Sequence, residues 1–396
     1  MRTQRRHIMA QCKACLYTTD HPFGLTLIDG LCSGCITHKE KYSIDWDGKY
    51  RELKNIANWA KDRSKTYDCI VPVVGDAEDY YVVSKVLELD LNPLIVSVNS
   101  YFLNDIGWSN LQNLITHFDL DSWIYNPEIQ TYKELIRTSL RKYNHMYLPW
   151  LQLHTSFPVH VAKEKKIPLV VWGANQAVEQ VGKFSHHDKA EMSSWSRVEH
   201  DLFGNDIVTL MGNGAQVNER KVNYYRYPTV STLGRDVKGI YLSNYMLWDP
   251  LKQNHSTIDF GFKPETNPFT FDPHERAGSS VYYGIHDLLK FQRLGYRKVT
   301  DQLSREIRHK RITKNDAILL NKKYHKNIPD IIPFFKWLDM TNSGIDWFIK
   351  HHLKNIATMP REENLDISCF SNLESLVTDS YLSIKKYIPF AKGLQI

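Results

Sequence analysis

The stretch Tyr67-Asp-Cys-Ile-Val-Pro-Val-Val74, followed by Gly75-Asp-Ala-Glu-Asp79, decides the fold. Its first part is short, apolar and rich in β-branched residues, which is typical of a strand buried within a sheet. Its second part is a turn that leads into a helical pattern from about residue 78 to residue 89. The stretch therefore reads as a strand, a glycine turn and a helix in succession.

The same alternation continues on both sides of this stretch. Further strands are predicted at 93–98, 122–125, 168–172 and 238–243, and further helices at 46–65, 108–118, 129–143 and 157–165. Strands that alternate with helices indicate an α/β fold, with a parallel sheet covered by helices on both faces. Such sheets bind ligands at the carboxyl ends of their strands, which directs attention to the turns after Val74, Val98 and Trp172.

Composition limits the class of protein. At 396 residues the chain has the length of about two or three domains. Its hydrophobic content of 42% and charged content of 24% are ordinary for a globular protein with a large core. The longest apolar runs, 69–75 and 167–174, are far shorter than the roughly 18–20 residues of a membrane-spanning helix.

The charge and the N-terminus favour a cytoplasmic protein and give little support to a nucleic-acid partner. A net charge of +6 over this length is weak evidence for a nucleic-acid partner. The basic N-terminus, Met1-Arg-Thr-Gln-Arg-Arg-His-Ile, lacks the apolar segment of a secretory signal. Residues 1–8 are read either as a dispensable tail or as preceding a true start at Met9.

Four of the six cysteines lie in one short N-terminal stretch. Cys12-Lys-Ala-Cys15 and Cys32-Ser-Gly-Cys35 are separated by sixteen residues, a spacing that predicts a four-thiolate zinc site. Asp29-Gly30 predicts the turn that brings the two pairs together. The alternative, two disulfides, does not persist in the cytoplasm. Four sulfur ligands leave no open position for water, so the predicted zinc is structural.

The pattern of the chain changes at two points. Residues 1–45 hold the tail and the predicted zinc ribbon, and residues 46–280 hold the α/β domain. Residues 281–396 show helical patterns, one of them opened by a capping box at Thr313, and predict a helical C-terminal domain. A basic run from Arg305 to Lys314 is read as a solvated helix face, with a phosphate-rich ligand or an acidic partner as the alternative.

These features together resemble the N-acetyl sugar amidotransferases, a family of the PP-loop ATP pyrophosphatase superfamily that serves bacterial surface-polysaccharide synthesis. The resemblance begins with the four-cysteine ribbon, the helix after it and the strand before Gly75. It continues in the same order through Trp172-Gly-Ala-Asn-Gln176, Gln180-Val-Gly-Lys-Phe-Ser-His186, Glu199-His-Asp-Leu202, Gly239-Ile-Tyr-Leu-Ser-Asn-Tyr245, Ile285-His-Asp-Leu-Leu-Lys-Phe291 and Gly295-Tyr-Arg-Lys-Val-Thr-Asp-Gln-Leu-Ser-Arg-Glu-Ile-Arg308. Spanning about residues 10–340, it implies a Rossmann-like sheet of the PP-loop/HUP type between a zinc ribbon and a helical C-terminal domain.

The resemblance also implies a reaction and its partners. In that family ATP, with Mg²⁺, activates the acetamido carbonyl of an N-acetylated sugar carried on a nucleotide or a lipid. Ammonia then converts the group to an acetamidino group in a precursor of lipopolysaccharide, O-antigen or a related surface glycan. The ammonia comes from a separate glutaminase and a barrel-type channel subunit, a pair related to that of the histidine pathway. This chain shows no convincing glutaminase nucleophile of its own, so the same two partners are expected.

The turn after the first strand departs from the family pattern. Members carry Ser-Gly-Gly-Lys-Asp-Ser, whereas this chain has Val74-Gly75-Asp76-Ala77-Glu78-Asp79. A phosphate loop works because bare backbone N–H groups and a helix N-terminus face the anion. Here Asp76 is expected to cap the helix, with Asp79 in its first turn. The chain's own carboxylates would then occupy the anion site.

Phosphate binding at this degenerate loop is expected to be lost or greatly weakened. Each carboxylate about 5 Å from a phosphate charge costs roughly 3 kcal/mol at an effective dielectric constant of about 20. Two or three such contacts would outweigh ordinary nucleotide affinity. The alternative is that these acids hold a metal ion or perform new acid–base chemistry.

Polar residues after the predicted fourth strand are the remaining site candidates. Asn175, Gln176 and Gln180 are candidates for substrate binding, because their amides could hold sugar hydroxyls, although they could equally cap the next helix. His186 and Asp188 are candidates for acid–base chemistry, with a plain polar loop as the alternative.

Three functions are open from the sequence. The first is an amidotransferase, and the second is a catalytically inactive relative that acts as a scaffold or regulator in the same pathway. The third is a tRNA-modifying PP-loop relative, since zinc ribbons and PP-loops also combine in tRNA thiolases. Such enzymes generally need extra reactive cysteines, and only Cys69 and Cys369 are spare. We predict the function of the amidotransferase family for this chain. Whether it uses ATP is left open by the sequence.

Overall fold

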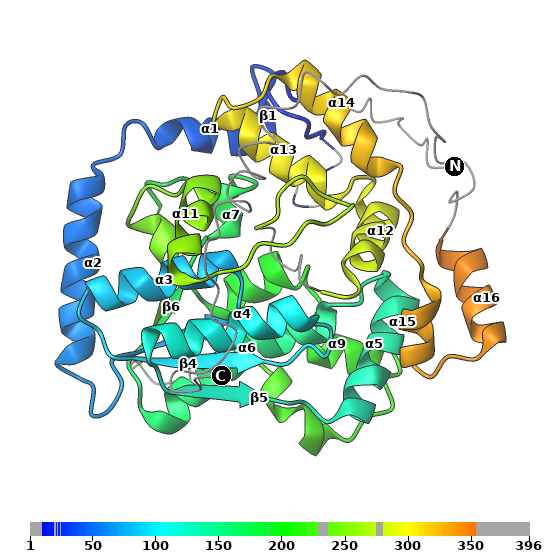
Figure 1. Ribbon diagram of the computed structural model, residues 1–396, viewed down its shortest axis with the longest axis horizontal. Coiled ribbons are helices and arrows are strands. Elements are labelled where there is room, and N and C mark those ends of the chain that lie inside the picture. The colour runs from blue at the N-terminus through cyan, green and yellow to red at the C-terminus, as the bar shows by residue number, and fades with distance from the viewer. Residues whose placement is uncertain are drawn as a thin grey trace, which may run out of the picture.

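A computed structural model describes residues 10–19, 21, 23, 25–188, 190–228, 237–274 and 280–353. At its centre lies a five-stranded parallel sheet with the strand order β5-β4-β3-β6-β7 (Figure 1). The strands are β3 (Cys69–Val73), β4 (Pro93–Val98), β5 (Ser122–Tyr125), β6 (Leu169–Trp172) and β7 (Lys238–Tyr241). The predicted parallel sheet is confirmed, and its first strand is its central one.

The order of the strands reverses between β3 and β6. These two strands pair at only two positions, Cys69 with Leu169 and Ile70 with Val170, whereas β3 and β4 pair at five. The pairing of β3 with β6 is thus confined to the beginning of both strands. Because ligands bind open α/β sheets where the strand order reverses, the carboxyl ends of β3 and β6 are the expected place for a site.

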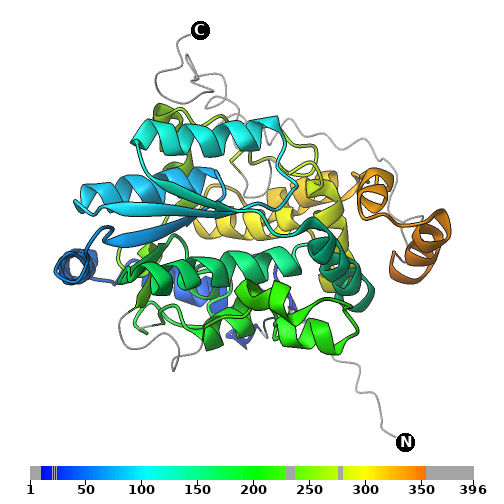
Figure 2. The same cartoon turned by 90° about the horizontal axis from the view of Figure 1, so that it is seen from below.

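Helices cover both faces of the sheet, as Figure 2 shows. Successive residues of a strand point to opposite faces, so Val71 joins the core under α3 (Ala77–Glu88) and α4 (Asp105–Phe118), and Ile70 joins the core under α6 (Leu148–Lys165). The other helices of this region are α2 (Trp46–Lys61), α5 (Ile129–Tyr143), α7 (Gln176–Glu179), α8 (Ser194–Ser196), α9 (Ile207–Gly212) and α11 (Pro250–Ser256). Short 3₁₀ segments lie at Glu219–Tyr225, Leu242–Asn244 and Thr257–Phe260, and a π-helical turn lies at Arg197–Asp201.

Helix α6 begins nine residues before the predicted start at residue 157. Pro149 lies in its first turn, where a missing N–H is tolerated, and Pro158 lies inside it. Leu148, Leu153, Phe157 and Val161 are buried against the sheet, and this packing outweighs the local cost of the internal proline. Propensity alone therefore placed the start of the helix too late.

The N-terminal unit is a small hairpin followed by a helix. Strands β1 (Leu27–Ile28) and β2 (Leu31–Cys32) pair antiparallel, and α1 (Ser33–Glu40) follows directly. Asp29 and Gly30 both have positive φ angles, 52° and 82°, as a tight hairpin turn of the I′ type requires. The predicted turn at Asp29-Gly30 is confirmed.

The described part of the C-terminal region is helical, as predicted. It contains α12 (Tyr283–Leu294), α13 (Lys298–Arg308), α14 (Lys314–His325), α15 (Ile332–Trp337) and α16 (Asn342–His352). Thr313 caps α14, since its hydroxyl accepts a hydrogen bond from the Asp316 N–H at 3.2 Å. The predicted domain boundary at residue 396 and Cys369 lie outside the described residues.

The C-terminal helices pack on both earlier parts of the chain. Leu288 of α12 and Phe335 of α15 share an apolar core with Ile136 of α5. The Tyr17 hydroxyl of the N-terminal unit donates to Asp301 Oδ1 of α13 at 2.6 Å. Within the described ranges, none of the helices combines the length and the apolar character needed to cross a bilayer.

Candidate functional site

The four N-terminal cysteines converge on one point. Their sulfur atoms all lie within 4.8 Å of one another, and all four side chains are buried. Cys12 and Cys35 have sulfur atoms 3.9 Å apart, and those of Cys15 and Cys32 are 3.6 Å apart. A tetrahedral zinc ion with Zn–S bonds of about 2.3 Å places its sulfur ligands roughly 3.8 Å apart. The cluster has the donor set and the spacing that zinc requires, and none of the four cysteines is in a disulfide.

A buried arginine lies beside this cluster. Arg308 Nη2 is 3.9 Å from Cys32 Sγ, and Arg308 Nη1 donates to the carbonyl of Gln180 at 2.7 Å. Zinc with four thiolates carries a net charge of about −2, which a neighbouring guanidinium offsets. Arg308 thereby joins the cysteine cluster to the segment that follows α7.

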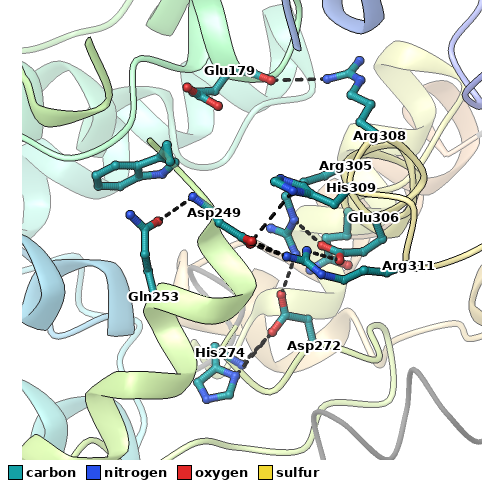
Figure 3. A network of polar contacts seen from close by, with 12 residues as sticks. Glu179, Asp249, Gln253, Asp272, His274, Arg305, Glu306, Arg308, His309 and Arg311 are labelled. Atoms are coloured by element: carbon teal, nitrogen blue, oxygen red, sulfur yellow. Dashed lines mark hydrogen bonds and ion pairs between the residues drawn. The ribbon is translucent and has the colours of Figure 1, made fainter. Parts of the chain in front are cut away.

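The prediction of a solvated basic face at 305–314 is wrong for three arginines. Arg311 contacts Asp249 and Glu306, and Arg305 contacts Glu306 and Asp272 (Figure 3). Glu306 and Asp272 are almost fully buried, so these ion pairs lie inside the protein. Glu306 lies within the run itself, but sequence alone could not place Asp249 and Asp272 opposite it, because they come from two other segments of the chain.

These ion pairs fix α13 against the α/β domain. Burial alone would raise the pKa of Asp272, but His274 and the Arg305 guanidinium hold that pKa well below its usual range. Arg311 binds both carboxylate oxygens of Asp249, the residue before α11, at 2.5 Å. The network therefore sets the position of α13 over the carboxyl end of the sheet.

The acidic turn after β3 is filled by one of its own side chains. Asp79 Oδ2 accepts hydrogen bonds from three successive backbone N–H groups, those of Val74 at 2.7 Å, Gly75 at 2.9 Å and Asp76 at 3.1 Å. Asp76 is the N-cap of α3 and forms a reciprocal capping box with Asp79. Ala77 is the first residue of the helix and is fully buried. The carboxylate on the loop amides is thus that of Asp79, and Asp76 is the cap.

Two close approaches shape this end of the sheet. Gly75 has a φ of +89°, and a Cβ there would lie 2.7 Å from the backbone nitrogen of Leu111, so only glycine fits. Glu78 reaches across from α3 to the end of β6, where its Oε1 accepts a hydrogen bond from the Ala174 N–H at 3.0 Å. The place where the strand order reverses is therefore occupied by two carboxylates of the chain itself.

A cavity of about 690 Å³ opens beside this acidic turn. Its walls come from the ends of β3, β4 and β6, from the π-helical turn at Arg197–Asp201, and from α12 and the start of α13. Arg197 stacks on the ring of Trp172 at 4.0 Å and pairs with Asp201 at 2.5 Å. Basic side chains from outside the sheet also line the cavity and were not predicted from the sequence; they include His145, Arg197, His200, His286, Lys290 and Arg293.

The three predicted substrate-binding residues all line this cavity. Asn175 is buried, and its amide donates to the carbonyl of Ala190 at 2.9 Å, which leaves its role structural in this arrangement. It precedes α7, although its side chain makes no capping bond. Gln180 lies 3.3 Å from the Tyr17 hydroxyl, and Gln176 faces the space between the sheet and α13.

His186 and Asp188 do not line the cavity. Asp188 is exposed and accepts a hydrogen bond from the Ser185 N–H at 2.8 Å, which closes a local turn. His186 is buried, with its Nε2 3.8 Å from Glu179 Oε1, and burial lowers its pKa to about 4. The two side chains serve different contacts, and this arrangement corresponds to the polar-loop alternative.

The fold and the cysteine cluster define the general class of this protein. It is a mixed α/β protein with a five-stranded parallel sheet and a cysteine cluster that could hold zinc. Residues 266–369 match a family model described as LPS biosynthesis protein WbpG-like, C-terminal domain. A comparison with curated proteins finds no match. The family match supports a role in lipopolysaccharide biosynthesis, and the matched region includes the cavity-lining residues of α12 and α13.

Replacing Asp79 by alanine is expected to destabilise the protein by about 1–3 kcal/mol, because three backbone N–H groups lose their acceptor. The free energy of unfolding in urea measures this loss. The matched control is Asp188→Ala, which removes one exposed hydrogen bond and should cost less than about 1 kcal/mol. Equal losses for the two variants would contradict the role assigned to Asp79.

Proposed function

We propose that this chain is an N-acetyl sugar amidotransferase-like protein of lipopolysaccharide, O-antigen or related surface-glycan biosynthesis that does not bind ATP at the turn after β3. The observation that carries the proposal is the position of Asp79, whose carboxylate holds three successive backbone N–H groups at 2.7–3.1 Å. In a PP-loop such amides receive phosphate. A carboxylate already seated there excludes a second anion.

Three features support the family part of the proposal. The strand order has the first strand at the centre and reverses between β3 and β6, in keeping with a Rossmann-like sheet of the PP-loop/HUP type. The cysteine cluster fits a structural zinc ribbon, with Cys12, Cys15, Cys32 and Cys35 as the ligands. The match of residues 266–369 points to the same pathway.

The site does not fit ATP or its Mg²⁺. Glu78 and Asp79 crowd the carboxyl ends of β3 and β6 with negative charge, and Ala77 stands where the family has a lysine. An acetamido carbonyl is a poor electrophile, and without a phosphoryl or adenylyl group its oxygen has no good way to leave. Ammonia attack in this cavity therefore needs an activated substrate that this chain does not prepare.

The same observation favours a second candidate function, a catalytically inactive relative. Such a protein would keep the cavity for an N-acetylated sugar linked to a nucleotide or a lipid. It would also keep the surfaces for the glutaminase and the barrel-type channel subunit, and would act as a scaffold or regulator. The tRNA-modifying alternative loses support, because Cys69 is fully buried in β3 and is the one described cysteine outside the cluster.

Isothermal titration with Mg-ATP tests the loss of nucleotide binding. The unmodified chain should show no binding below millimolar concentrations and release no pyrophosphate. A loop variant carrying Val74→Ser, Asp76→Gly, Ala77→Lys, Glu78→Asp and Asp79→Ser should gain affinity, because it restores the bare amides and the lysine. Micromolar binding with pyrophosphate release by the unmodified chain would overturn the proposal.

A reaction assay separates the two candidate functions. Full-length protein is incubated with ammonium chloride and a panel of nucleotide-linked N-acetylated sugars, with and without ATP, and the products are followed by mass spectrometry. The inactive candidate predicts no acetamidino product from the unmodified chain. The panel therefore includes O-methyl acetimidate derivatives of these sugars, from which ammonia displaces methanol without ATP. Acetamidino product formed from them faster with the protein than in a protein-free control would support catalysis on a substrate activated elsewhere.

A further inference from the structure

One face of α12 carries three basic side chains toward the cavity. His286, Lys290 and Arg293 are spaced at i, i+4 and i+7, which aligns them on one stripe of the helix. All three line the cavity of about 690 Å³.

Arg293 differs from the other cations of this cavity in its partners. Lys290 pairs with Asp301, and Arg197 pairs with Asp201. Arg293 Nη1 donates to the backbone carbonyl of Asn144 at 2.6 Å, and no carboxylate of the described residues lies within ion-pair distance of its guanidinium. Burial lowers the pKa of Arg293 to about 10, the direction expected for a charge without a counter-ion.

Two histidines, the buried His145 and the partly buried His286, lie near Arg293. The rings of His145 and His286 are 6.2 Å apart, and Tyr147 packs edge-on against His286 at 4.7 Å. The Nδ1 atoms of both histidines are buried without a hydrogen-bond partner in the described part of the chain. Burial lowers the pKa of both rings, and the charge of Arg293 near His145, or of Lys298 and Arg293 near His286, lowers it further, so both rings are neutral near pH 7. A neutral imidazole can donate one hydrogen bond to a ligand oxygen.

We propose that Arg293, His145 and His286 form an anion-binding subsite in this cavity, for the phosphate or carboxylate group of an acidic substrate. A partly buried guanidinium without a counter-ion is costly, and a bound oxyanion reduces that cost. The planar fork of arginine matches two oxygens of phosphate or carboxylate at once. The inference rests on the proposed function only in taking this cavity as the substrate site. It assigns anion recognition to α12, away from the occupied loop after β3.

Titration of the full chain with two probes tests this subsite. Inorganic pyrophosphate represents a phosphate source and glucuronate a sugar carboxylate, both measured at low ionic strength. Arg293→Gln should weaken the binding of the preferred probe by about tenfold or more, the effect of losing a charge-assisted hydrogen bond. The matched control Arg220→Gln, an exposed arginine outside the cavity, should bind like the unmodified chain.

The relative affinities of the two probes identify the ligand or overturn the subsite. Tighter binding of pyrophosphate identifies a phosphate-bearing ligand, and tighter binding of glucuronate identifies a carboxylate. Binding of neither probe at millimolar concentrations, or binding unaffected by Arg293→Gln, would overturn the subsite. Because these outcomes do not involve ATP, a negative result removes the subsite and leaves the ATP titration to decide the proposed function.

Folding is checked separately from binding. Without ligand, Arg293→Gln should still melt in one cooperative transition, because it removes a partly buried charge that has no counter-ion together with one hydrogen bond to the Asn144 carbonyl. If that variant does not fold, Arg293→Lys serves instead. It keeps the charge and loses the planar fork, so it should bind the preferred probe a few times more weakly. Binding by Arg293→Lys equal to that of the unmodified chain would then contradict the subsite.

Discussion

Replacing Cys32 by serine is expected to abolish metal binding and unfold the N-terminal unit. The unit has a hairpin of two-residue strands and little core beyond the cysteines themselves. In zinc-finger peptides the metal contributes about 10–16 kcal/mol of apparent folding free energy. Elemental analysis should find one zinc ion per unmodified chain and none in the variant. Thermal unfolding of the variant should begin at a lower temperature.

The control for this experiment is Cys69→Ser. Cys69 is also fully buried, but it lies in β3 and takes no part in the cluster. It should lose stability through a buried hydroxyl and keep its zinc. Full metal content in Cys32→Ser, or an unmodified chain that contains no zinc, would contradict the assignment of the four thiolates.

Asp287→Ala is expected to give the second large effect, a loss of about 3–5 kcal/mol in the free energy of unfolding. Asp287 and Arg297 are both fully buried, and their closest oxygen and nitrogen are 3.3 Å apart. Burial raises the pKa of Asp287 and lowers that of Arg297, so desolvation outweighs their attraction in both groups. Removing the carboxylate leaves the guanidinium charge buried without it. Urea unfolding followed by circular dichroism measures the loss.

The double variant Asp287→Ala with Arg297→Met provides the decisive comparison. It removes both charges and fills most of the space with an apolar side chain, so it should recover much of the stability lost in Asp287→Ala. Losses that simply add would show that the two side chains act independently. Asp287 also accepts a hydrogen bond from the Lys298 N–H at 2.7 Å, so the recovery should be incomplete.

Local patterns were sufficient to predict the sheet and much of the helical structure. The apolar runs that became β3, β4 and β6 are short and continuous because strands of a parallel sheet are buried on both faces. The cysteine spacing likewise predicted the cluster, since each pair and the turn between the pairs are local features. Asp79 was placed correctly in the first turn of α3, although its three contacts with the loop amides were not foreseen.

The site was less predictable because its walls come from distant segments. His145, Arg197 and Arg293 are far apart in the sequence, and only the fold brings them to one cavity. Arg305 and Arg311 appeared to belong to a solvated face because their partners Asp272 and Asp249 lie well before them in the chain. The spacing of His286, Lys290 and Arg293 was a signal within reach, since it places three basic residues on one stripe of a helix that is otherwise largely buried.

The packing of the N-terminal unit against α13 and α14 has a consequence for biosynthesis. Tyr17, Cys32 and the Cys12 carbonyl contact residues that are synthesised much later. Their partners are Asp301, Arg308 and Lys314 respectively, and Lys314 Nζ donates to the Cys12 carbonyl at 2.6 Å. At about 5–20 residues per second, a ribosome needs roughly 15–60 seconds to make the intervening chain. Throughout that interval the nascent ribbon presents an uncovered surface to the cell. During this delay the uncovered surface of the N-terminal unit is accessible to chaperones or zinc-delivering proteins.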